Sequence, residues 1–240
     1  MSSRQPTILA TSGGYRTPDN GDREFTPLLH YAAELSGAEG RPNFCHLDTA
    51  NGDQRFMGGM MSEAGYKAGF NWINVNLFAE PTFADLEEVL LAQDVIWVNG
   101  GSVVNLLAVW RAHGLDSILR RVWDSGVVLA GISAGSLCWY EGGPTDSFGP
   151  PLRTVTNGLG FLPYGNGVHY DSEGDRRPAV HRDVENGLFE EVHCTDDGAG
   201  LVYQGTKLIE AVADIPGARG YVVRSVDGQA KEEPLPTRQL

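Results

Sequence analysis

The sequence predicts a single α/β domain of the three-layer type, with helices on both faces of a mostly parallel sheet. Short β-type runs alternate with helical stretches over the first 140 residues, a rhythm typical of crossover connections between parallel strands. The runs 95–98 and 127–132 are continuously apolar, as strands covered on both faces are. With 240 residues, 41% of them hydrophobic and 20% charged, the chain can bury a core without disulfides or metal.

Local signals justify the elements of the first half in order. The first strand runs into Thr-Ser-Gly-Gly, and Thr26-Pro27 is an N-cap followed by proline at the first helical position. Ile73, Val75 and Leu77 alternate with asparagines, which indicates a strand with one wetter face. His113-Gly114 breaks a later helical stretch. Strands are therefore expected at 7–10, 43–47, 73–77, 94–98 and 127–132, and helices at 26–36, 54–68, 83–91 and 106–122.

The second half has a different character. Glycines and prolines crowd residues 141–176, which predicts loops and hairpins. A helix is expected at about 178–190, a late β-hairpin from 200–203 and 207–213, and a last strand at 221–226. The domain is assigned to residues 1–228, and residues 229–240 are expected to form a polar C-terminal tail on the surface.

Composition excludes several classes of protein. Eighteen basic against 31 acidic residues give a net charge of −13, which argues against nucleic-acid binding because that needs a basic face. Apolar runs stay well below the roughly 18 residues of a membrane span, and the N-terminus lacks the apolar core of a leader. Three cysteines without CxxC spacing disfavour a disulfide framework and a zinc site. We expect a cytoplasmic protein without metal or organic cofactor.

The most informative stretch for chemistry is Gly131-Ile-Ser133-Ala-Gly135, which follows the apolar strand 127–132. A serine in a tight turn between a strand and a helix exposes its hydroxyl, and the flanking glycines remove steric clashes. Ser133 is therefore a candidate nucleophile. The alternative is a glycine-flanked serine in an ordinary turn.

A second glycine pair, Gly100-Gly101, follows the neighbouring strand 94–98. Ligand sites in open α/β sheets lie beyond the carboxyl ends of the strands. Two such turns side by side would bring the backbone N–H groups of Gly101 and Ala134 together as oxyanion donors. A plain tight turn is the alternative here too.

These motifs resemble the peptidase E (aspartyl dipeptidase) and cyanophycinase family of serine peptidases. The resemblance runs from Ile8 to about Val212, and it is carried by the segments Trp97–Leu107, Gly131–Trp139, Glu141–Ser147, Gly158–Pro163, His169–Asp171 and Asp196–Gly198. It implies a sheet related to class I glutamine amidotransferases, with serine in place of their cysteine. It also implies a Ser–His–acid peptidase of short peptides, which in the founding members begin with aspartate.

The resemblance also assigns the remaining site residues. Of six histidines, His169 matches the base of the family. The acid, commonly glutamate before a glycine, corresponds to Asp197, with Asp196 as the alternative. Arg176 and Arg177 fall roughly where aspartyl dipeptidases carry a substrate-binding arginine, although a solvated basic pair would look the same.

The motifs and the resemblance together predict a serine peptidase that hydrolyses short peptides through an acyl-enzyme. The expected substrates are dipeptides with an N-terminal aspartate. Two alternatives stay open: an esterase or amidase with the same triad, and a non-catalytic relative that binds a small ligand. The expected partner is a small peptide substrate, neither nucleic acid nor membrane, and a homodimer is left open.

Overall fold

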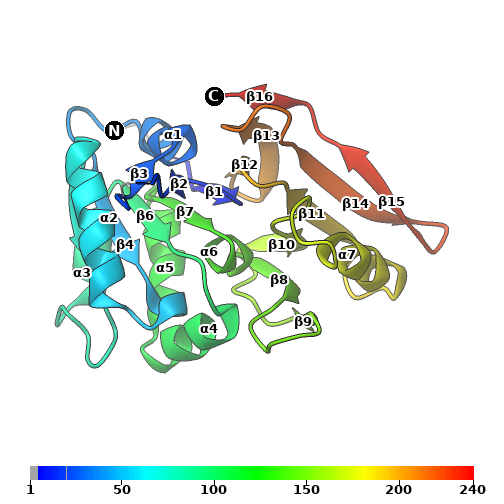
Figure 1. Cartoon of the computed structure of the whole chain (residues 1–240). Coiled ribbons are helices and arrows are strands. Elements are labelled where there is room, and N and C mark those ends of the chain that lie inside the picture. Colours follow the sequence, from blue (N-terminus) through cyan, green and yellow to red (C-terminus); the bar gives the residue numbers. More distant parts are fainter. Residues whose placement is uncertain (1–4, 20) are drawn as a thin grey trace.

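A computed structural model describes residues 5–19 and 21–240 and contains one large and one smaller sheet (Figure 1). Residues 1–4, on which the expectation about a leader depends, and residue 20 lie outside the described residues. Five parallel strands form one side of the large sheet, from β1 in its interior to β5 at its edge: β1 (Thr7–Thr11), β7 (Val128–Ile132), β6 (Val95–Val98), β4 (Asn43–Leu47) and β5 (Asn71–Asn74). Next to β1 the sheet continues with β12 (Ala199–Gln204), β13 (Lys207–Ala213) and β16 (Thr237–Gln239). A two-stranded ribbon, β2 (Tyr15–Arg16) and β3 (Glu24–Phe25), follows β1.

Helices cover both faces of this sheet, as the sequence predicts. The alternation along β6 shows the two faces: Val95 and Trp97 belong to one buried cluster, and Ile96 and Val98 to another. The first cluster packs under α1 (Pro27–Ser36) and α2 (Arg55–Lys67), and the second under α3 (Leu86–Leu91), α4 (Val103–Ala112) and α5 (Leu115–Asp124). None of the helices in the described ranges has the length and apolarity needed to cross a bilayer.

Helix boundaries follow from the residues at their ends. Proline opens α1, and Gly37 closes it in the left-handed conformation with its N–H donated to the carbonyl of Glu34 at 3.0 Å. The carboxylate of Asp85 caps α3 by accepting the N–H of Glu88 at 2.9 Å. Gly114, at φ +67°, separates α4 from α5 and confirms the predicted break.

The smaller sheet takes three of its strands from the segment expected to be loop and hairpin and three from later in the chain. Its strands are β8 (Tyr140–Thr145), β9 (Arg153–Val155), β10 (Leu162–Gly167), β11 (Glu191–Thr195), β14 (Gly220–Val226) and β15 (Gln229–Pro234), and α7 (Arg176–Glu185) packs on it (Figure 1). The glycines here serve close packing as well as turns. A Cβ at Gly142 would lie 1.8 Å from the carbonyl oxygen of Val155, and one at Gly143 would lie 2.0 Å from that of Asn166.

The C-terminal residues differ from the expected surface tail. β15 pairs antiparallel with β14, and β16 adds a parallel strand beside β13. The polar composition that suggested a tail instead suits exposed edge strands, which carry charged side chains. Glu232 of β15 even turns inward, where it accepts a hydrogen bond from the hydroxyl of Tyr170 at 2.6 Å.

Candidate active site

Ser133 lies in a strained turn between β7 and the short helix α6 (Ala134–Leu137). Its backbone has φ +58° and ψ −115°, a region that non-glycine residues rarely adopt. The N–H of Ser133 donates to the carbonyl of Thr11 at 3.1 Å, which ties the turn to β1. The conformation and the strand–turn–helix context are those of a nucleophile elbow.

The two glycines around Ser133 are required by close backbone packing. A Cβ at Gly131 would lie 2.4 Å from the carbonyl oxygen of Gly135, and a Cβ at Gly135 would lie 2.2 Å from that of Val98. Any larger residue at either position would force β6, β7 and α6 apart. The Gly-x-Ser-x-Gly pattern therefore has a steric cause in this fold.

The second glycine turn lies beside the elbow, as the sequence predicts. A Cβ at Gly100 would lie 3.1 Å from Cβ and 3.7 Å from Oγ of Ser133. Gly101, at φ +133°, passes so close to Ala50 that a Cβ would lie 2.6 Å from its carbonyl oxygen. As the first residue of α6, Ala134 has no acceptor within its own helix for its N–H. The arrangement brings the two turns together beside Ser133.

A buried polar network holds the Gly100–Gly101 turn, and sequence reasoning missed it. Asn51 donates through Nδ2 to the carbonyl of Gly100 at 2.7 Å and to Asp48 Oδ1 at 2.9 Å. Asn99 donates to the same carboxylate oxygen at 2.9 Å, and its own Oδ1 accepts the hydroxyl of Tyr15 at 2.8 Å. Asp48 and Asn99 each follow a buried strand directly, and that shared placement was the available signal.

His169 and Asp197 are in direct contact. His169 Nδ1 lies 2.5 Å from Asp197 Oδ1, with 21% of the histidine and 42% of the aspartate side chain exposed. The hydrogen bond with His169 holds the pKa of Asp197 below its usual value. Because Nδ1 faces the carboxylate, Nε2 is the ring nitrogen left for another partner.

Backbone contacts fix the position of the histidine. His169 has φ +51°, and its N–H donates to Ser12 Oγ at 3.0 Å. Ser12 follows β1 and also contacts Oγ1 of Thr195, at 2.6 Å, near the end of β11. Residues from both sheets thus meet at His169.

Asp196, the alternative acid, has a different set of partners. It is 5% exposed, and its Oδ2 accepts the N–H of Arg219 at 3.0 Å and the hydroxyl of Tyr221 at 3.1 Å. Of the two aspartates, the structure brings only Asp197 to His169.

Arg176 and Arg177 do not line the cavity beside His169. Arg176 is 2% exposed and donates to the carbonyl of Pro144 and to Glu173. Arg177 pairs with Glu232, and its guanidinium lies over the Tyr170 ring, 4.3 Å from the centroid. Sequence proximity to His169 suggested a site role, whereas the contacts give both arginines places in the packing of α7.

The competing histidines also have partners elsewhere. His193 is buried between the hydroxyl of Tyr203, 2.6 Å from Nδ1, and Glu191, 2.5 Å from Nε2. His181 Nε2 lies 3.2 Å from Glu232. The three cysteines are free and buried, and the tryptophans Trp110, Trp123 and Trp139 belong to the core.

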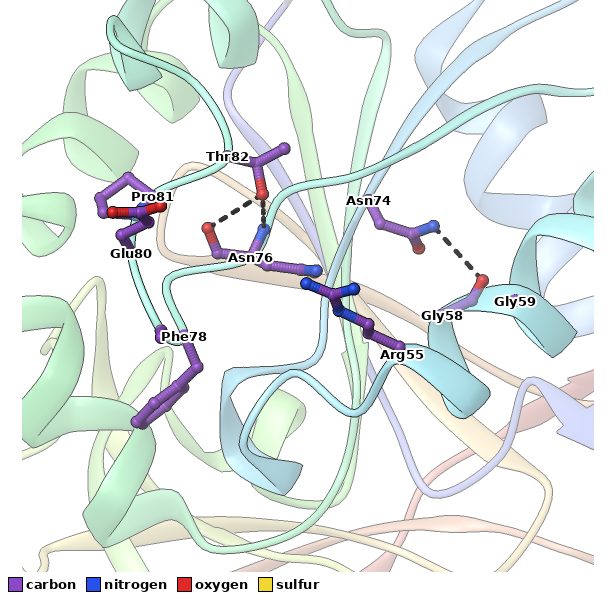
Figure 2. A pocket seen from close by; sticks show the side chains of 10 residues that line it. Arg55, Gly58, Gly59, Asn74, Asn76, Phe78, Glu80, Pro81 and Thr82 are labelled. Atoms are coloured by element: carbon purple, nitrogen blue, oxygen red, sulfur yellow. Dashed lines mark hydrogen bonds between the residues drawn. The ribbon is translucent and has the colours of Figure 1, made fainter.

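Two cavities have the same volume and are candidate sites. One, of about 550 Å³, is lined by His169, Asp197 and Ile132, the neighbour of Ser133. Another of about 550 Å³ lies beyond the edge strand β5 and is polar, with Arg55, Asn74, Asn76 and Thr82 in its wall (Figure 2). Figure 2 shows Thr82 bonded to Asn76 and Asn74 bonded to the carbonyl of Gly58. Since His169 and Asp197 line the first cavity and neither lines the second, we place the candidate active site at the first.

Comparisons with known proteins identify the family of the chain. The model of peptidase family S51 matches residues 8–211. The chain is 39% identical over 235 residues to the uncharacterized peptidase YgaJ of Bacillus subtilis (strain 168), covering 97% of this chain and 98% of the relative.

Two solved structures share the fold. A peptidase from an acI-B1 Actinobacterium superposes with a TM-score of 0.71 at 16% identity, covering 98% of this chain and 97% of that one. A putative peptidase E protein from Listeria monocytogenes EGD-e superposes with a TM-score of 0.62 at 15% identity, covering 85% and 96%. The family model and the Bacillus relative, which both span most of the sequence, show that this chain belongs to peptidase family S51.

Proposed function

We propose that the chain is a serine peptidase of short peptides, in which Ser133, His169 and Asp197 act as the catalytic triad. The observation that carries the proposal is the 2.5 Å contact between His169 Nδ1 and Asp197 Oδ1 in a cavity that begins at Ile132, next to the strained Ser133. Membership of family S51 supports peptide hydrolysis.

In the proposed mechanism, Ser133 Oγ attacks the peptide carbonyl carbon while His169 Nε2 takes the hydroxyl proton. Asp197 keeps the proton of the neutral imidazole on Nδ1 and stabilises the imidazolium that forms. The N–H groups of Gly101 and Ala134 donate to the oxyanion of the tetrahedral intermediate. His169 returns its proton to the leaving amine, which leaves an acyl-enzyme on Ser133. Water then attacks the ester with His169 as base, and the acid and free Ser133 are regenerated.

The family resemblance implies a preference for peptides with an N-terminal aspartate. Arg176 and Arg177 were expected to bind the aspartate side chain, but Arg176 donates to Pro144 and Glu173, and Arg177 pairs with Glu232. The expectation therefore has no support from these two side chains.

Steady-state hydrolysis of a dipeptide library, with matched esters alongside, tests the proposal. We expect peptide turnover that Ser133→Ala lowers on the order of 10⁴-fold or more. Ser136→Ala is the matched control, because Ser136 is buried one turn away and donates to Asn166 Oδ1 at 3.1 Å. Turnover of esters without peptides would favour the esterase alternative, and binding without turnover of either would favour a non-catalytic relative.

A further inference from the structure

Several segments that are far apart in the sequence form the wall of the cavity beside His169. Residues 12–16, between β1 and β2, form one part, and residues 25–27, at the start of α1, form another. Asp214 and Ile215, directly after β13, close it next to Asp197. Its volume of about 550 Å³ is within the range of small-molecule sites, so one or two amino-acid residues fit.

Apolar side chains form much of this wall. The Phe25 ring lies 5.0 Å from the ring centroid of Trp72, within an aromatic cluster. Ile215 is 49% exposed and lies against Gly198, where a Cβ would be 2.5 Å from its Cγ1. The glycine after Asp197 thus makes room for an aliphatic side chain beside the proposed triad. An exposed isoleucine is common by itself, but here it joins Phe25 and Ile132 around one cavity.

The charged groups of the wall disfavour an acidic ligand. The guanidinium of Arg16 is engaged by Glu24 at 2.9 Å and is largely in solvent. Asp197 is engaged by His169. The carboxylate of Asp214 accepts only a long bond, 3.4 Å, from the N–H of Leu28, and no lysine or arginine of the described residues forms an ion pair with it. A substrate carboxylate would therefore meet a surplus of negative charge, in a chain of net charge −13.

From this wall we infer that the cavity receives an uncharged, apolar side chain of the substrate residue next to the scissile bond, and that it discriminates against aspartate. The inference rests on the proposed function and names its substrate class. Burial of a leucine-sized side chain contributes about 1.5–3 kcal/mol, which corresponds to roughly 10–200-fold in kcat/KM.

Dipeptides that differ only in leucine, asparagine or aspartate, which have similar shapes, provide the test. Each is placed first at the N-terminal and then at the C-terminal position against alanine. We expect kcat/KM to fall in the order Leu, Asn, Asp at one of the two positions, by about 10-fold or more between Leu and Asp. Equal or faster hydrolysis of the aspartate peptide at both positions overturns the inference.

A charge placed on the wall sharpens the test. Ile215→Lys should lower the ratio of leucine to aspartate hydrolysis at least 10-fold, because it adds a cation to the cavity and removes apolar surface. Ile209→Lys is the matched control, since Ile209 is 41% exposed on β13 and lies outside the cavity. An unchanged ratio in Ile215→Lys, with the thermal transition intact, contradicts the inference.

Binding measurements separate this inference from the proposed function. Ser133→Ala is titrated calorimetrically with the Leu-Ala, Ala-Leu, Asp-Ala and Ala-Asp peptides. Tighter binding of a leucine peptide supports the inference even if turnover is lost, whereas tighter binding of an aspartate peptide, or no binding at all, overturns it. If peptides are hydrolysed by Ser133 but aspartate is preferred, the proposed function stands and the inference fails.

Discussion

Replacement of Asp197 by asparagine changes the proposed triad while keeping its shape. The 2.5 Å contact with His169 is a charge-assisted hydrogen bond in the catalytic state, and bonds of this kind contribute about 1.5–3 kcal/mol. Because 42% of the Asp197 side chain is exposed, we take the lower half of that range, or roughly 10–50-fold in rate. The asparagine amide can also donate to Nδ1, which moves the imidazole proton to Nε2 and removes the base. The expected loss in kcat/KM for Asp197→Asn is therefore on the order of 10²–10⁴.

Asp196→Asn is the matched control for this change. The Asp196 carboxylate is buried and accepts from Arg219 and Tyr221, and an asparagine oxygen can accept both bonds. Burial raises the pKa of Asp196, so the neutral amide costs little there. We expect kcat/KM within about 3-fold of the wild type. Steady-state hydrolysis of one dipeptide by both variants is the assay, and a large loss in Asp196→Asn with little in Asp197→Asn would refute the assignment.

Three further predictions concern the frame around the site. Asn51→Ala removes the donor to the carbonyl of Gly100 and should lower kcat about 10-fold with KM unchanged. A rise in KM without a change in kcat, measured by steady-state kinetics, would contradict a role of the Gly100–Gly101 turn in stabilising the oxyanion. Gly135→Ala should lower the free energy of unfolding by about 3 kcal/mol or more in urea titrations, because its Cβ would lie 2.2 Å from a carbonyl oxygen. Gly59→Ala, in the open part of α2, should stabilise by up to about 1 kcal/mol, and equal effects of the two changes would refute the steric account. Burial lowers the pKa of His46 and His193, so below about pH 6.5 the unfolded chain binds more protons than the folded one. The free energy of unfolding should therefore fall as the pH falls, by up to about 1.4 kcal/mol per pH unit for each histidine. A free energy of unfolding that stays constant from about pH 7.5 to 5.5 would contradict this.

The parallel half of the fold and the elbow could be predicted because their signals are local. Continuous apolar runs identify β6 and β7, and the Gly-x-Ser-x-Gly pattern directly follows one of them. The same logic located the Gly100–Gly101 turn beside Ser133. Contacts between residues far apart in sequence could not be predicted in this way. Nothing near Asp48 shows that Asn51 and Asn99, the latter 51 residues on, converge on its carboxylate.

Three features were misread because one residue type can serve several purposes. Glycines at 142 and 143 indicated turns, yet they lie in a strand where neighbouring carbonyl groups leave no room for a Cβ. The polar residues 229–240 indicated a tail, yet most of them form edge strands. Arg176 followed His169 closely enough to suggest a shared site, but Arg176 is the first residue of α7 and is buried against Pro144.

Covalent labelling with a fluorophosphonate tests the central claim, that Ser133 is a nucleophile activated by His169. The account predicts that Ser133 Oγ displaces fluoride, and that peptide mass spectrometry finds one adduct, on the peptide that contains Ser133. Ser136→Ala should label at the wild-type rate, His169→Ala should label far more slowly, and Ser133→Ala should not label. An adduct that persists in Ser133→Ala, or wild-type protein that stays unlabelled while it hydrolyses peptides, would contradict the account.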